Sequence, residues 1–308
     1  MRLSKPLFST AAVGLALLAS AAAIPALSFS CAASTSADPK VLHLIDRLSF
    51  GPRPGDIERV ESMGVERYIQ EQLSPDSIPE PQSLTNQLNS LETINLNPEE
   101  LFTQYGPPRR ITGQKPSREA ITAARQRQRL ILAQATQARL LRDSESPRQL
   151  QEVMTDFWYN HFNVFANKGL DQLWVGAYEA EALRPYALGH FRELLAATAQ
   201  HPAMLYYLDN WQNTAPGSPG ARGRFQGLNE NYAREVMELH TLGVDGGYTQ
   251  QDVTALARIF TGWGFRRYGQ QAEVMYGVNF DPKRHDFGDK VFLGHTIKGR
   301  VTLDCIRH

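Results

Sequence analysis

The sequence predicts a mainly α-helical fold, a single multi-helix domain with a small β-hairpin near the C-terminus. Apolar residues recur at helical spacing through most of the 308 residues, whereas alternating runs typical of strands occur only after Trp263. The two cysteines, Cys31 and Cys305, exclude a scaffold built on several disulfides. The fold must therefore depend on an apolar core.

The first residues are typical of an export signal. Arg2 and Lys5 precede an apolar run over residues 7–23, and that run ends in three alanines of the kind that signal peptidases accept. We therefore expect a signal peptide over residues 1–23 and a flexible linker over residues 24–39. The mature protein is then exported, to the periplasm or outside the cell.

The N-terminus leaves one alternative open, an uncleaved membrane anchor. The apolar run is near the lower length limit for spanning a bilayer, and no charged stop-transfer residues follow it, so no transmembrane span is expected after cleavage. A lipoprotein is not expected either. Lipidation of Cys31 would need a leucine-like residue three positions earlier, where Ser28 stands.

The charge balance argues against a nucleic-acid partner. Lysine plus arginine equal aspartate plus glutamate at 32 each, so no net field attracts polyanions. Residues 109–148 are basic, but no aromatic residue is interleaved with the charges, which favours a solvated helix face.

Helices are expected over much of the remaining chain. Residues 74–116 are the exception: they are rich in Pro, Asn, Ser and Gln, and we expect a long surface excursion with one short helix over 97–105. Ser117 and Ser146 are predicted helix caps, and Thr249 with Asp252 forms a predicted capping box. The helical segments are 41–48, 54–63, 65–73, 117–142, 147–161, 173–181, 187–199, 203–209, 230–242 and 250–261.

Two segments near the C-terminal end are not helical. Residues 273–280 and 290–293 alternate, and we expect them to pair as one β-hairpin with a turn at Asp281-Pro282. Residues 216–227 form a glycine-rich loop that carries Arg222 and Arg224. This loop is predicted to gather an anion at the following helix start, to act as a lid, or to be a plain connector.

Six ordered sequence blocks between Asp156 and Gly294 resemble a known family. They read FWYNHFNVFANKG, ALRPYALGHFRELL, HPAMLYYLDN, GLNENYAREVMELHTLGVDGGYTQQDV, FTGW and FDPKRHDFG, and LIDRLSFGPRPGDIERV stands near the start. Together they resemble the bacterial family called domain of unknown function 1800, over residues 40–299. The resemblance implies an exported, largely helical protein, and no activity is established for the family. Members usually continue with further helices, so we expect residues 300–308 to be an atypical tail on an incomplete copy.

The helix over residues 230–242 carries the best candidate for a metal site. Asn231, Glu235 and Glu238 lie at positions i, i+4 and i+7 and therefore share one face. With His161 and His201 approaching from other helices, these oxygen donors could hold a divalent metal. The competing interpretation is a chain of ion pairs through Arg234, from Glu230 to Arg234 and from Arg234 to Glu238.

A second hypothesis is a helical glycan-acting enzyme similar in layout to lytic transglycosylases. Glu230 or Glu235 would be its acid, with a pKa raised by burial, and Trp211, Trp263 or Tyr232 would stack on sugars.

A third hypothesis is a non-catalytic binding or assembly module of the cell envelope. The chain has no GxSxG motif, no phosphate-binding loop, no dinucleotide fingerprint and no CxxC pair. In this interpretation His161 is a packed histidine at a helix end, whereas His285 is expected to be solvated.

Overall fold

The computed structural model describes residues 37–108, 115–223, 225–265 and 278–299. The predicted signal peptide, the linker up to residue 36 and the tail from residue 300 lie outside this part of the chain. The described residues from Asp38 onward belong to one compact unit.

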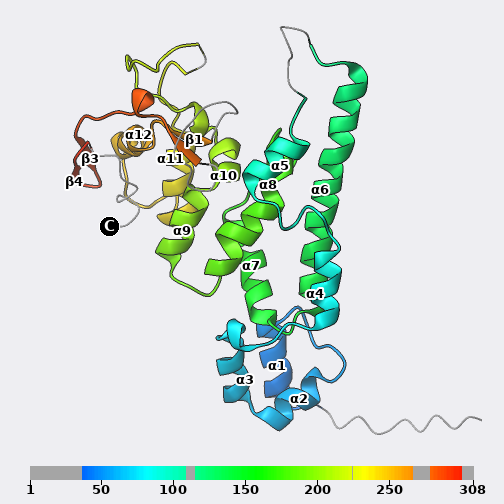
Figure 1. Cartoon of the computed structure of the whole chain (residues 1–308). Coiled ribbons are helices and arrows are strands. Elements are labelled where there is room, and N and C mark those ends of the chain that lie inside the picture. Colours follow the sequence, from blue (N-terminus) through cyan, green and yellow to red (C-terminus); the bar gives the residue numbers. More distant parts are fainter. Residues whose placement is uncertain (1–36, 109–114, 224, 266–277, 300–308) are drawn as a thin grey trace, which may run out of the picture. The chain divides into compact units, whose positions relative to one another are not determined.

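The structure is mainly α-helical, as predicted, with small antiparallel sheets near the C-terminus (Figure 1). The α-helices are α1 (Pro39–Leu48), α2 (Asp56–Met63), α3 (Val65–Gln72), α4 (Gln82–Asn89), α5 (Pro98–Tyr105), α6 (Arg118–Glu145), α7 (Gln149–His161), α8 (Asp171–Tyr178), α9 (Phe191–Ala199), α10 (Pro202–Tyr207), α11 (Asn231–Glu235) and α12 (Gln250–Ile259). Two π-helical segments, η2 (Glu179–Leu183) and η5 (Val236–Thr241), continue α8 and α11. Short 3₁₀ turns are η1 (Pro75–Ser77), η3 (Arg184–Tyr186), η4 (Asn210–Gln212) and η6 (Pro282–Arg284).

The first three helices bury their own small apolar cluster, which contains Val41, Ile45, Val60 and Tyr68. The Gln72 side chain connects this cluster to the start of α7: it donates to the Pro147 carbonyl at 3.0 Å and accepts from the Leu150 amide at 3.1 Å.

The predicted surface excursion over residues 74–116 is wrong for most of its length. Helix α4 lies there in addition to the expected short helix α5, and Ile78, Leu84 and Leu91 are buried. Leu84, Leu88 and Leu91 stand at i, i+4 and i+7, a helical spacing that the polar and proline-rich composition of the segment obscured. The indole of Trp174 also donates to the Pro98 carbonyl at 3.1 Å, which fixes the start of α5.

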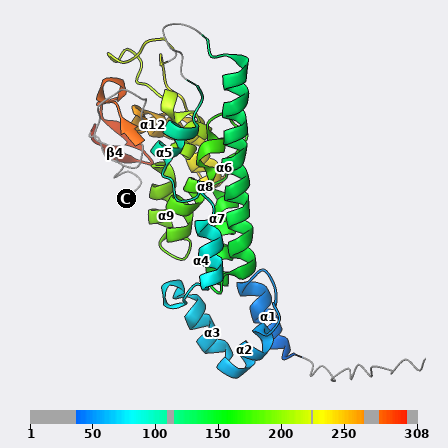
Figure 2. The ribbon, with the colours of Figure 1, turned by 45° about the vertical axis from the view of Figure 1, so that its right-hand side comes forward.

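Helix α6 has 28 residues, slightly more than expected, and Ser117 caps it as predicted by accepting from the Ala120 amide at 3.2 Å. It lies beside α7 and α8 (Figures 1 and 2). The approach to α8 is close, because a β-carbon at Gly176 would stand 2.9 Å from that of Ala135.

The main core lies among α8, η2, α9, α10, α11 and α12. Tyr178, Leu183, Met204 and Tyr232 are among its fully buried side chains. Among the described helices, none is both long and apolar enough to cross a membrane.

The strands pair differently from the predicted single hairpin. Strand β1 (Trp263–Phe265) pairs with β2 (Val278–Phe280), and β3 (Lys290–Phe292) pairs with β4 (His295–Ile297). Each pair forms its own two-stranded sheet, and the Asp281-Pro282 turn begins η6 instead of joining two strands. The second pair is closed by Leu293 and Gly294, both with positive φ, a turn geometry that suits a tight hairpin.

Candidate functional site: a carboxylate-lined groove

The face predicted for Asn231, Glu235 and Glu238 exists, and it lines a groove of about 450 Å³. The other lining residues come from the segment before α8, from the end of α10 and from the same helix: Lys168, Tyr207, Leu208, Asp209, Arg234 and Leu239. The helical spacing in the sequence was therefore sufficient to bring the three oxygen donors to one surface.

The helix that carries them is interrupted. The Asn229 side chain accepts from the Asn231 amide at 3.0 Å, at the start of α11. After Glu235 the chain becomes π-helical, and the Leu242 amide donates to the Met237 carbonyl, five residues back, at 3.0 Å. This wider turn buries His240 in the core while Glu235 and Glu238 still line the groove. Single π turns of this kind are often found at functional sites.

The negative charges of Glu235 and Glu238 have no direct partner among the described residues. Neither carboxylate makes a hydrogen bond or an ion pair with any residue that the structure describes. Burial raises the pKa of Glu235, and the neighbouring charge of Glu238 raises it further. A carboxylate whose ionisation is disfavoured by burial and by a neighbouring negative charge is stabilised by a cation placed beside it.

Lys168 and Asp209 form the other wall of the groove. The Lys168 ammonium donates to the Tyr207 carbonyl, lies 3.1 Å from a carboxylate oxygen of Asp209 and stands 5.4 Å from the centre of the Tyr207 ring. Asp209 has a φ of 57°, which is uncommon for a residue other than glycine.

Asp171 is fully buried, and the charges of Lys168 and Asp209 are close enough to affect its pKa. Its carboxylate oxygens have no hydrogen-bond partner among the described residues. Burial raises its pKa to about 8, although Lys168 acts in the opposite direction. Asp171 is therefore largely protonated at neutral pH.

The predicted ion-pair chain forms only in its first half. Glu230 lies 3.2 Å from Arg234, and it also accepts from Gln250 at 2.8 Å and from Thr254 at 2.9 Å. Arg234 donates to Gln250 instead of pairing with Glu238. Glu230 thus holds α11 against α12, and the catalytic role considered for it would require breaking these contacts.

The two histidines predicted as metal ligands do not line the groove. His161 has its Nε2 3.1 Å from the His240 carbonyl, within a cluster of aromatic rings. His201 caps α10, where its Nδ1 accepts from the Ala203 amide at 3.2 Å. Within the described ranges, no group of three or more His, Cys, Asp or Glu side chains could hold a metal ion. The five-residue ligand set stays a prediction.

A pair that the sequence did not reveal joins the buried His201 to the partly exposed Glu181. The Nε2 of His201 stands 3.8 Å from a carboxylate oxygen of Glu181, and neither atom has a hydrogen bond to a described residue. Burial lowers the pKa of His201 to about 3 and raises that of Glu181 to about 7. The pair is thus neutral in mildly acidic solution. No spacing connects residues 20 positions apart, so only the fold reveals it.

The aromatic residues considered for sugar stacking each pack against another aromatic ring of the protein. Trp211 stacks on Tyr206 with ring centres 5.9 Å apart, and Trp263 lies 5.1 Å from Phe280. Tyr232 is buried against Phe260. The aromatic ring that does line the groove, Tyr207, was not among the candidates.

The remaining predicted binding residues lie in the glycine-rich loop or beyond it. Arg222 forms an isolated β-bridge with Phe225, and Arg224 lies outside the described residues.

The expectation of a solvated His285 is wrong. Its ring is buried, with Nδ1 2.7 Å from the Thr261 carbonyl.

The fold and the groove together define a mainly helical protein with a polar, carboxylate-lined surface site. The chain belongs to the family described as Protein of unknown function (DUF1800), whose model matches residues 43–306. No curated protein and no solved structure matches the chain. The function is therefore inferred from the residues of this chain.

Proposed function

We propose that this protein is an exported binding module whose groove holds a cationic ligand, an ammonium group, between Glu235 and Glu238. The observation that carries the proposal is the pair of uncompensated carboxylates on one wall of the groove. Bringing a positive charge between them removes their mutual repulsion and lowers the pKa of Glu235 towards its ordinary value.

The groove already contains one ammonium group of the protein itself. Lys168 is held by a carbonyl, by the carboxylate of Asp209 and by the face of Tyr207. Oxygen acceptors together with an aromatic ring are the usual surroundings of a bound ammonium. The opposite wall offers Glu235, Glu238 and the side-chain oxygen of Asn231 to a second one.

An ammonium ligand fits this groove better than a divalent metal. Calcium takes six to eight oxygen ligands, and zinc prefers nitrogen and sulfur donors that the groove lining does not supply. A metal site that includes His161 and His201 would require both side chains to leave their contacts with the His240 carbonyl and the Ala203 amide.

Calorimetric titration tests the proposal, with spermidine as the probe at low salt. The wild-type protein should bind it, and Glu235→Gln with Glu238→Gln should weaken binding by about tenfold or more, because each lost charge removes on the order of 1 kcal/mol or more. Glu66→Gln on α3 is the control and should bind as the wild type does. Equal binding by the double variant would contradict the proposal, and tight binding of manganese chloride alone would favour the metal hypothesis.

Export is supported by the charged, apolar and small-residue order of residues 1–23. Intact-mass measurement of the protein recovered from bacterial cells tests it. A chain shortened near residue 23 and released with the periplasmic fraction is the expected result. A full-length chain in the cytoplasmic fraction would contradict export.

The glycan-acting alternative is favoured by one observation, the raised pKa of Glu235 in a groove that also contains Tyr207. A general acid is favoured by a pKa that is raised above the ordinary carboxyl value. Clearing of a peptidoglycan suspension that disappears in Glu235→Gln would establish it, and absence of clearing with wild type would exclude it for this substrate.

A further inference from the structure

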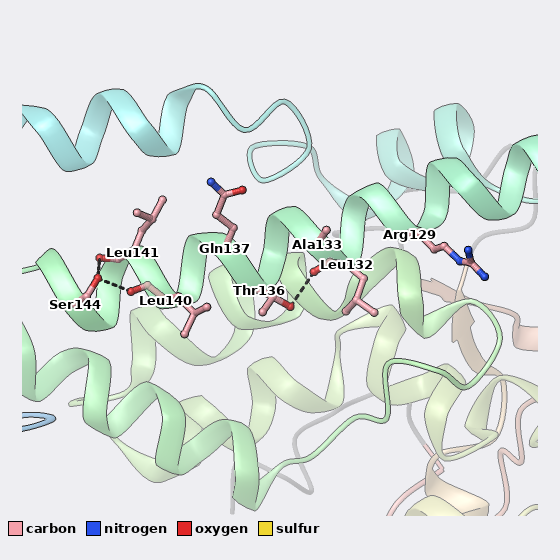
Figure 3. A pocket seen from close by; sticks show the side chains of 8 residues that line it. All are labelled: Arg129, Leu132, Ala133, Thr136, Gln137, Leu140, Leu141 and Ser144. Carbon is pink, nitrogen blue, oxygen red and sulfur yellow. Dashed lines mark hydrogen bonds between the residues drawn. The ribbon is translucent and has the colours of Figure 1, made fainter. Parts of the chain in front are cut away.

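The outer side of α6 carries an apolar recess of about 600 Å³ whose lining residues all belong to this helix (Figure 3). The lining positions advance by three or four residues over about four turns, so they form one continuous face. They are Arg129, Leu132, Ala133, Thr136, Gln137, Leu140, Leu141 and Ser144. The opposite face, with Ala124, Ile131 and Ala138, is buried in the domain.

The hydroxyl groups on this face already donate hydrogen bonds within the helix. Thr136 donates to the Leu132 carbonyl at 2.9 Å, and Ser144 donates to the Leu140 carbonyl at 2.7 Å, as the dashed lines in Figure 3 show. Both side chains thereby satisfy their hydroxyls within the helix and turn carbon atoms outward. The recess is in effect an apolar surface, with Leu140 61% exposed.

The shape of the recess suits a second helix. The long side chains of Leu132 and Leu140 flank the smaller Ala133 and Thr136, so a shallow depression lies between the two leucines. This is the arrangement into which a side chain of a packed helix inserts. A lipid surface needs no such recess, and the face lacks the aromatic residues that usually accompany binding at a membrane interface.

The charges beside the recess indicate what kind of helix fits. Arg118, Arg125 and Arg129 follow each other at spacings of seven and four residues, so they extend the same face towards the N-terminus of α6. All three are exposed, and none forms an ion pair with a described residue. No acidic residue occurs between Glu119 and Asp143. The basic half of this face therefore complements a partner with clustered carboxylates.

We propose that this face of α6 is the docking site for an acidic amphipathic helix of a partner protein. Leucine-like side chains of the partner fill the recess at Ala133 and Thr136, and its glutamates or aspartates meet Arg118, Arg125 and Arg129. Laying an apolar stripe into a groove is a common mode of peptide recognition, and the charges select the partner and its direction. The site is separate from the carboxylate-lined groove, since the two share no residue.

Fluorescence anisotropy with a labelled synthetic helix tests this proposal. The probe carries leucines at the a and d positions of three heptads and glutamates at the flanking positions, and the comparison peptide has lysine at every glutamate. We expect the acidic peptide to bind and the lysine peptide to bind about tenfold more weakly or not at all. Equal binding of both peptides, or no saturable binding of the acidic one, overturns the proposal.

Variants on α6 locate the binding surface. Leu140→Gln, and Arg125→Gln together with Arg129→Gln, should each weaken binding by about tenfold. The matched control is Arg127→Gln, which removes an exposed charge of the same helix from a different side and should change binding by less than about twofold. Circular dichroism checks that each variant is folded, which the exposure of Leu140 favours.

Two further measurements test whether a second copy of the chain or a lipid surface covers this face instead of a partner helix. Light scattering should show a monomer over the concentrations used, and a dimer abolished by Leu140→Gln would mean that a second copy covers the face. Vesicles of phosphatidylglycerol should not bind the wild-type protein, and binding lost in Arg125→Gln with Arg129→Gln would mean a lipid surface. Either result overturns the partner-helix proposal.

Discussion

Replacing Arg184 by glutamine should strongly destabilise the protein. Arg184 lies against Glu152 on α7 and donates to Glu179 on η2 at 2.7 Å. Its side chain is 15% exposed, that of Glu152 is 2% exposed, and that of Glu179 is 9% exposed. Glu179 keeps a second partner, because Arg139 lies 2.6 Å away. The substitution therefore leaves one carboxylate, that of Glu152, buried without a direct ion-pair partner.

We expect a loss of about 3–5 kcal/mol in the free energy of unfolding at pH 7, the usual cost of breaking a buried pair from one side. Burial already raises the pKa of Glu152 despite Arg184, whereas two arginines keep the pKa of Glu179 below its ordinary value. Without Arg184 the pKa of Glu152 rises further. The folded variant then binds a proton that the unfolded chain binds less well, so its deficit should shrink as the pH falls from 7 to 5.

Urea unfolding followed by circular dichroism at pH 7 and pH 5 measures this loss. A second change, Glu152→Gln, removes the stranded charge and should recover more than half of the stability, while Arg127→Gln is the control for losing an exposed arginine. A variant as stable as the wild type at pH 7, or a deficit that grows in acid, would mean that Arg184 does not neutralise a buried charge on Glu152.

Three further predictions follow from other buried or groove residues. Acid should destabilise the wild-type protein between about pH 6.5 and pH 3. Burial holds the pKa of His201 at about 3, so over this range the histidine takes a proton only in the unfolded chain. The urea midpoint of His201→Gln should therefore fall less than that of the wild type. Glu181 has the opposite effect. Its pKa of about 7 means that the folded protein binds a proton before the unfolded chain does, which adds stability as the pH falls from 7 to about 4.5. The urea midpoint of Glu181→Gln should therefore fall more in acid than that of the wild type. Gly176→Leu should cost about 1–3 kcal/mol in thermal or urea unfolding by forcing α8 away from Ala135, and Ala135→Gly should recover part of it; an unchanged midpoint would mean that the two helices do not approach as described.

Local signals in the sequence predicted most helices and several of their ends. Ser117 caps α6, and Thr249 with Asp252 forms the expected capping box, because a side-chain oxygen next to free amides acts within a few residues. Helix α4 was missed because the segment is dominated by polar residues and prolines, although Leu84, Leu88 and Leu91 stand at i, i+4 and i+7. Strand pairing was wrong because pairing depends on contacts between distant segments, as between Trp263 and Phe280.

The carboxylate face of the candidate site was predictable for the same local reason. Residues at i, i+4 and i+7 stay together even though Glu238 lies in a π-helical turn. Lys168 and Asp209 come from other segments, and the fold alone brings them opposite. His161 and His201 were attractive ligands in the sequence, but both side chains make structural contacts with neighbouring backbone. Spacing can identify a shared face, but not which distant residues meet it.

A crystal structure of the protein with bound spermidine would show whether the groove holds an ammonium group. We expect an amine nitrogen within about 3 Å of carboxylate oxygens of both Glu235 and Glu238, in the groove that contains Lys168 and Tyr207. Spermidine bound elsewhere while this groove stays empty, or a metal ion held there by Glu235, Glu238 and a displaced histidine, would contradict this expectation.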